Sequence, residues 1–130
     1  MTATTHPTPT MIILYVDVPP ASAAFYEKLF GIAPVELSAT FAMFILPQGL
    51  VFGLWSRHTV EPAAAGTGGM GGGGELAIRL DTADAVDALH AQWQALGLTM
   101  LQAPVELDFG RTFVATDPDG HRIRAFHPSA

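Results

Sequence analysis

Apolar and polar residues follow one another along the chain in a pattern that predicts several strands and two helices. Residues 11–18 (MIILYVDV) are apolar and rich in β-branched side chains, which indicates a buried strand. Pro19 ends this run, and residues 21–31 (ASAAFYEKLFG) follow as a helix that Gly31 closes. Three shorter strand-like runs come next: residues 34–37, 41–46 and 50–56.

The second half of the chain repeats this order. Residues 75–81 (ELAIRLD) predict a strand, and Asp81 or Thr82 caps a helix with one apolar stripe that Gly97 closes. Three further strands are predicted at residues 98–107, 111–116 and 121–127. The two closing glycines, Gly31 and Gly97, lie 66 positions apart in a chain of 130 residues. We therefore interpret the sequence as two copies of one β-α-β-β-β module.

A glycine-rich segment separates the two copies. Its sequence, EPAAAGTGGMGGGG, favours neither a helix nor a sheet and is typical of a flexible linker. The predicted fold class is α+β, with two tandem βαβββ modules that form concave mixed sheets. The predicted division is a disordered tail (residues 1–9), a first module (10–60), the linker (61–74) and a second module (75–130).

Composition narrows the classes of function. A chain with 49% hydrophobic residues can bury the core of one domain. Its net charge of −6 has the wrong sign for binding nucleic acid or an anionic membrane surface. The chain has no cysteine, so disulfides and thiolate chemistry are excluded. With neither a signal peptide nor an apolar span in view, we expect a cytoplasmic protein.

Two weak motifs do not predict a cofactor. Residues 66–71 (GTGGMG) match the glycine fingerprint of dinucleotide-binding proteins, but a strand rather than the required helix is expected to follow them. The five histidines, at positions 6, 58, 90, 121 and 127, lack the spacing of metal ligands, although residues distant in sequence can meet in space. We therefore expect neither a metal nor a cofactor.

Trp55 is the first candidate for ligand binding. Alternation along its strand places Phe52 and Leu54 on one face and Gly53 and Trp55 on the other. If the first face packs under a helix, Trp55 stands on the opposite face beside a residue with no side chain. Such a flat slot suits stacking of a planar ligand. The alternative is that Trp55 fills a dimer or sheet interface.

Two segments carry a resemblance to a known superfamily. Residues 11–32 (MIILYVDVPPASAAFYEKLFGI) and 117–128 (DPDGHRIRAFHP) resemble the two ends of the glyoxalase/bleomycin-resistance, or vicinal oxygen chelate, superfamily. Within it, residues 52–56 (FGLWS) and 108–113 (DFGRTF) are similar to those of phenazine-resistance proteins and relatives that bind quinoxaline-type antibiotics. The resemblance implies a homodimer whose concave cups hold flat ring systems, with modules paired within one chain or swapped between two.

The same resemblance bears on metal chemistry. Enzymes of this superfamily hold a divalent metal with His, Gln and Glu at four inward positions. Aligned on the strand-helix pattern, three of these positions hold Met11, Glu75 and Arg124, and the fourth lies near Trp55. A thioether, one carboxylate, a guanidinium and an indole do not form a site for a hard cation. The enzymatic chemistry is therefore disfavoured.

We therefore expect a protein that sequesters a phenazine- or quinoxaline-type antibiotic without modifying it. In this hypothesis Trp55 stacks on the rings, while Arg111, Arg124 and Glu75 orient the ligand, unless Glu75 and an arginine form an internal ion pair. The expected ligand-binding residues are Met11, Ile13, Tyr15, Phe44, Gly53, Trp55, Ser56, Glu75, Arg111, Phe113, Arg124 and Phe126. The alternatives are a metal-dependent glyoxalase- or dioxygenase-like enzyme and a subunit that receives a partner protein.

Overall fold

The computed structural model describes residues 7–64, 73–116 and 121–129. The glycine motif at residues 66–71 and most of the predicted tail lie outside the described residues, as does the turn at residues 117–120. No helix in the described ranges is long and apolar enough to cross a bilayer.

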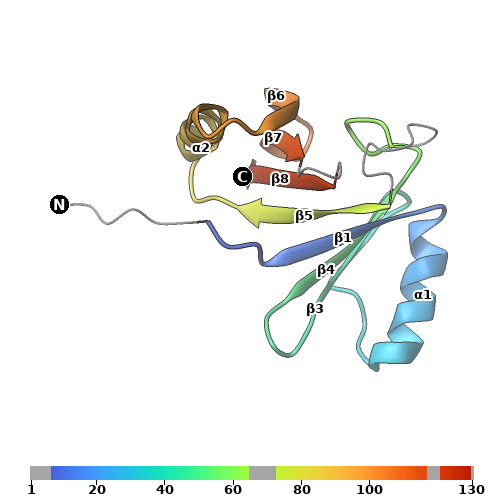
Figure 1. The fold of residues 1–130 in the computed structure, drawn as a ribbon. Helices are drawn as coiled ribbons and strands as arrows, with labels where there is room; N and C mark the ends of the chain where they lie inside the picture. The colour runs from blue at the N-terminus through green and yellow to red at the C-terminus, as the bar shows by residue number, and fades with distance from the viewer. Residues whose placement is uncertain (1–6, 65–72, 117–120, 130) are drawn as a thin grey trace.

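The elements follow one another as two copies of a βαβββ module, as the sequence predicted (Figure 1). The first copy comprises β1 (Met11–Val16), α1 (Pro19–Phe30), β2 (Glu36–Leu37), β3 (Phe41–Ile45) and β4 (Val51–Ser56). The second comprises β5 (Gly74–Arg79), α2 (Ala83–Ala95), β6 (Thr99–Leu107), β7 (Gly110–Thr116) and β8 (Arg122–Pro128). Gly74, which we assigned to the linker, is the first residue of β5.

Local signals explain where the helices begin and end. Pro19 opens α1, where its missing N–H removes no helical hydrogen bond. Gly31 ends α1 in the left-handed conformation, at a φ of 71°, and its N–H donates to the carbonyl of Glu27. The Thr82 side chain caps α2 by accepting a hydrogen bond from the Ala85 N–H.

All eight strands form one mixed sheet in the order β2-β3-β4-β1-β5-β8-β7-β6. The two modules use the same internal pairing, since β1 runs parallel to β4 and β5 runs parallel to β8. Antiparallel pairing of β1 with β5 joins the two modules within one chain. The α+β fold class with a mixed sheet is confirmed.

Both helices cover the same face of the sheet and leave the other face concave. Helix α1 packs on β3 and β4, and α2 packs on β6, β7 and β8 (Figure 1). The predicted alternation is confirmed: Leu14 and Leu54 pack in the cluster beside α1, whereas Ile13 and Trp55 belong to a cluster on the opposite face. This concave face is the surface on which a ligand site can form.

Two of the expected wall residues lie beneath the helices instead. Phe44 is fully buried in the cluster against α1, and Phe113 is fully buried in the cluster against α2. Strand alternation turns both rings away from the concave face, because the residues that share their face pack under the helices. Their placement as pocket walls is therefore corrected.

Candidate functional site

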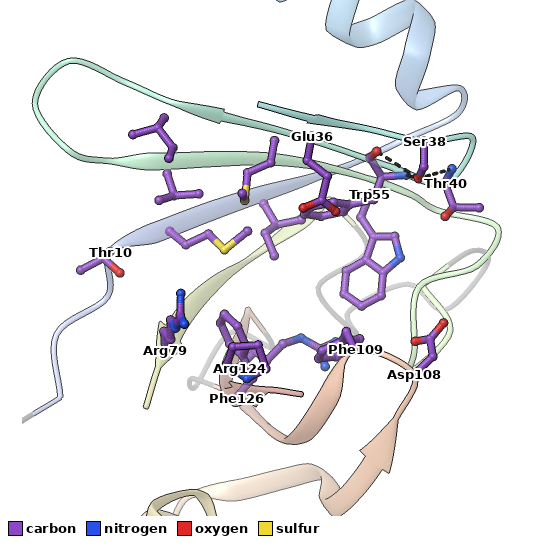
Figure 2. Close-up of a pocket in the computed structure, with 17 residues that line it drawn as sticks. Thr10, Glu36, Ser38, Thr40, Trp55, Arg79, Asp108, Phe109, Arg124 and Phe126 are labelled. Carbon is purple, nitrogen blue, oxygen red and sulfur yellow. Dashed lines mark hydrogen bonds between the residues drawn. The ribbon is translucent and has the colours of Figure 1, made fainter. Parts of the chain in front are cut away.

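A cavity of about 590 Å³ opens on the concave face (Figure 2). Its size is in the range of pockets that enclose small organic ligands. Strands from both modules contribute, together with the turn between β6 and β7. The lining residues are Thr10, Met11, Ile13, Glu36, Ser38, Thr40, Phe41, Met43, Ile45, Val51, Trp55, Arg79, Asp108, Phe109, Arg124, Phe126 and Pro128.

Aromatic rings from three parts of the chain meet in this cavity. The Trp55 indole lies 5.7 Å from the Phe109 ring and 6.1 Å from the Phe41 ring, centroid to centroid, with both pairs close to perpendicular. Phe126 continues the series at 6.3 Å from Phe109. Trp55 stays half-buried among these rings, so part of its indole is accessible to an aromatic ligand.

The floor of the cavity holds a buried ion pair. Nε of Arg124 donates to Oε2 of Glu75 at 2.6 Å, and the side chains are 2% and 0% exposed. The Tyr15 hydroxyl donates to the other carboxylate oxygen at 2.6 Å. The Arg124 guanidinium also lies over the Trp55 ring, 5.0 Å from its centroid. Arg124 therefore forms the internal ion pair with Glu75 that the sequence analysis left as an alternative to ligand binding.

Burial raises the pKa of the Tyr15 hydroxyl well above its usual value, and the nearby Glu75 carboxylate adds to the effect. Arg122 and Arg124 oppose this shift only in part. Tyr15 therefore remains a neutral hydrogen-bond donor over the physiological pH range.

Arg122 is a second buried arginine, which the sequence analysis did not select. Its two terminal nitrogens donate to the carbonyls of Pro62 and Ala63 at 2.6 and 2.7 Å. Arg124 donates to the carbonyl of Glu61 at 2.6 Å. The two arginines of β8 therefore bind three consecutive backbone carbonyls, at residues 61–63, where the predicted linker begins. Alternation along β8 would have placed Arg122 on the same face as Arg124.

Five of the expected site residues line the cavity directly: Met11, Ile13, Trp55, Arg124 and Phe126. Tyr15 and Glu75 do not line the cavity themselves, but Glu75 accepts hydrogen bonds from the Tyr15 hydroxyl and from the lining residue Arg124. The flat slot predicted next to Gly53 is filled, because a Cβ at this glycine would lie 3.1 Å from the tips of both Met11 and Phe41. The glycine thus makes room for these two side chains.

Two further expected residues point elsewhere. Ser56 is the buried last residue of β4, and its hydroxyl accepts a hydrogen bond from the N–H of His58, in the turn that follows, at 3.1 Å. Arg111 reaches α2 instead of the cavity and donates to Asp87 at 2.9 Å and to Glu106 at 3.3 Å. These contacts raise the pKa of the Arg111 guanidinium. Neither residue is positioned to contact a ligand in the cavity.

Several lining residues were missed, and Phe109 is the most informative. It lies in the turn between β6 and β7, which brings its ring over β8 and against Trp55. The motif Asp108-Phe109-Gly110 was visible in the sequence, but only the tertiary fold shows that this turn reaches the cavity. Glu36 was also missed, and Arg79, which alternation along β5 places on the same face as Glu75, adds charge to the lining as well.

A second cavity, of about 440 Å³, adjoins the first. The two share Thr40, Asp108 and the rings of Trp55 and Phe109. Thr59, Glu61 and Leu107 line the second cavity and not the first. Trp55 therefore contributes to the walls of both cavities.

Comparisons with known proteins agree with this architecture. The sequence profile described as the Glyoxalase/Bleomycin resistance protein/Dioxygenase superfamily matches residues 8–125. The phenazine antibiotic resistance protein EhpR of Enterobacter agglomerans is 32% identical over 120 residues, which cover 90% of this chain and 89% of the relative.

Solved structures share the fold. A Legionella pneumophila structure described as an NAD-dependent benzaldehyde dehydrogenase is 39% identical, with a TM-score of 0.84; the match covers 92% of this chain and 98% of the other. Methylmalonyl-CoA epimerase from Mycobacterium tuberculosis has a TM-score of 0.70 at 17% identity, with 100% and 94% covered. At that identity the epimerase likeness shows the fold alone.

Proposed function

Because the chain belongs to the glyoxalase/bleomycin resistance protein/dioxygenase superfamily, we propose that it binds a planar aromatic antibiotic of the phenazine or quinoxaline type. In this proposal the protein sequesters the drug in the concave cavity without changing it chemically. The protein acts in the cytoplasm as a homodimer. Sedimentation analysis of the purified protein tests the dimer, and fractionation of the native host tests the location.

The observation that carries this proposal is the aromatic lining of the cavity around Trp55. Trp55, Phe109 and Phe126 form a connected wall next to the apolar side chains of Met11 and Ile13. Each aromatic pair contributes about 0.5–1.5 kcal/mol beyond the area that it buries. Such a wall recognises a flat ring system by its shape and faces rather than by a reactive group.

The polar groups of the floor favour binding over catalysis. Glu75 is already engaged by Tyr15 and Arg124, so its carboxylate is not available as a base or as a metal ligand. The inward positions that hold metal in the superfamily's enzymes carry Met11, Glu75 and Arg124 here. This donor set does not fit a hard divalent cation. Among the described residues no group of three His, Cys, Asp or Glu side chains is placed to hold one.

The name of the Legionella relative raises the question of a nicotinamide cofactor, and the described helices argue against a pyrophosphate site. Pyrophosphate binds to free N–H groups at the start of a helix. Helix α1 begins with Pro19 and Pro20, which have no N–H. Helix α2 begins with the Thr82 cap and has Asp84 in its first turn, which repels phosphate. The described segment after the glycine motif is strand β5.

Fluorescence titration tests the proposal. Chelator-treated protein is titrated with phenazine-1-carboxylic acid and with a quinoxaline, alongside Trp55→Ala and Trp93→Phe. Trp93 packs against Phe113 under α2, 5.5 Å between ring centroids, so it serves as the control indole outside the cavity. We expect saturable quenching in the wild type and in Trp93→Phe, with affinity reduced on the order of tenfold or more in Trp55→Ala.

Chromatography of the released ligand completes this test. The drug should be recovered unchanged after prolonged incubation with the protein. Recovery of a modified product, or binding that begins only when a divalent metal is added back, would favour the enzyme hypothesis. A protein that binds none of these aromatic compounds but captures a polypeptide would favour the partner-binding alternative.

A further inference from the structure

Arg79 is a cation of the cavity lining that has no acidic partner among the described residues. It is the last residue of β5, pairs in register with Phe126 of β8, and lines the cavity with an exposed side chain. Within residues 7–64, 73–116 and 121–129, no carboxylate or carbonyl accepts a hydrogen bond from its guanidinium. Its five N–H donors are therefore free to bind a ligand.

The other arginines of the second module are already engaged. Arg124 is neutralised by Glu75, Arg122 donates to backbone carbonyls, and Arg111 is paired with Asp87. In a chain with six basic and twelve acidic side chains, cations readily find acidic partners. Arg79, which is exposed in the lining of the cavity, is therefore positioned to bind an anionic ligand.

The negative charges of the lining fix where an anion can bind. Glu36 and Asp108 also line the cavity. Figure 2 shows Arg79 at the end near Thr10, with Asp108 at the opposite end, beyond Trp55. A ligand carboxylate placed near Asp108 would meet a like charge, whereas at the other end it meets a guanidinium. The cavity therefore has a positive side chain, Arg79, at one end and a negative side chain, Asp108, at the other.

We propose that the ligand is an aromatic carboxylic acid whose carboxylate binds Arg79 while its rings lie against the wall at Trp55. This inference rests on the proposed function and adds the chemical class of the ligand and a residue that selects it. The planar guanidinium can bind both carboxylate oxygens at once, which fixes the orientation of the ring system as well as its charge.

Two phenazines that differ in one substituent, a carboxylate or an amide, test this inference. Phenazine-1-carboxylic acid and phenazine-1-carboxamide are titrated into the wild type, Arg79→Gln and Lys28→Gln. The control variant removes a charge of the same sign from α1, on the other face of the sheet. We expect the wild type and Lys28→Gln to prefer the acid by about tenfold. Arg79→Gln should lose this preference while it still binds the amide, which also shows that the variant is folded.

The possible failures are distinguishable. If the wild type binds acid and amide equally, or if Arg79→Gln keeps the preference, the role of Arg79 is refuted and the binding function stands. If neither phenazine binds to any of the three proteins, the binding function and the role of Arg79 fail together. Added salt should reduce the preference for the acid and leave amide binding unaffected.

Discussion

The buried pair of Glu75 and Arg124 predicts a large loss of stability when the carboxylate is replaced by an amide. The Glu75 side chain is fully covered and accepts two hydrogen bonds of 2.6 Å, one from the Tyr15 hydroxyl and one from Nε of Arg124. Glu75→Gln keeps the size of the side chain but removes its charge. One of its two acceptor atoms also becomes an NH₂ group, which cannot accept.

The magnitude follows from what Arg124 retains. In the variant the guanidinium, 2% exposed, has only neutral acceptors among the described residues: the amide oxygen at position 75, the Thr112 hydroxyl and the Glu61 carbonyl. Removing one partner of a buried ion pair typically costs about 3–5 kcal/mol. A domain of this size has a free energy of unfolding of about 5–15 kcal/mol. We therefore expect Glu75→Gln to lose about a fifth or more of its free energy of unfolding.

Urea unfolding followed by circular dichroism measures this loss, and it avoids the fluorescence of Trp55 beside the pair. Glu36→Gln, which removes an exposed carboxylate from the same cavity, is the matched control and should change stability by less than about 0.5 kcal/mol. The double variant Glu75→Leu/Arg124→Met should recover much of the loss, because no unpaired charge stays buried. A loss below about 1 kcal/mol in Glu75→Gln is the size expected for an ion pair exposed to solvent. That result would refute the inference that the buried pair of Glu75 and Arg124 stabilises the fold strongly.

Two further predictions concern the backbone and pH. Gly110 has a φ of 140°, and a Cβ there would lie 2.2 Å from the His127 carbonyl oxygen, so Gly110→Ala should lose roughly 1–3 kcal/mol or more in urea unfolding. Gly31→Ala, where a Cβ meets nothing within 4 Å, should lose less, and equal losses would contradict the predicted clash. The folded state raises the pKa of Tyr15, so the neutral hydroxyl contributes to the free energy of unfolding. This contribution should be fully present below the ordinary tyrosine pKa of 10.0 and should decrease as the pH rises above it. Tyr15→Phe should flatten this fall in thermal unfolding, and an unchanged slope would exclude Tyr15 as its source.

The order of the elements could be predicted from the sequence because its signals are local. Gly31 and Thr82 act on their own helices. β1 is apolar on both faces, so its inward face followed from the superfamily resemblance, which aligns Met11 with an inward position. In β4, Gly53 beside Trp55 distinguishes one face from the other.

The remaining site residues depend on tertiary information. In β3 and β7 both faces are largely apolar, so a shift of one residue would exchange Phe44 or Phe113 with its neighbours, and the pattern does not decide between them. Phe109 enters the cavity only because the β6–β7 turn folds back over β8. Alternation along β5 places Arg79 on the inward face, but only the tertiary fold shows that no carboxylate within the described residues pairs with it.

Pairing of β1 with β5 joins the two modules at the middle of the sheet. Met11 and Trp55 in the cavity lining come from the first module, whereas Arg124 and Phe126 come from the second. The cavity therefore depends on this one strand pairing, and a change that weakens it would divide the lining into two parts.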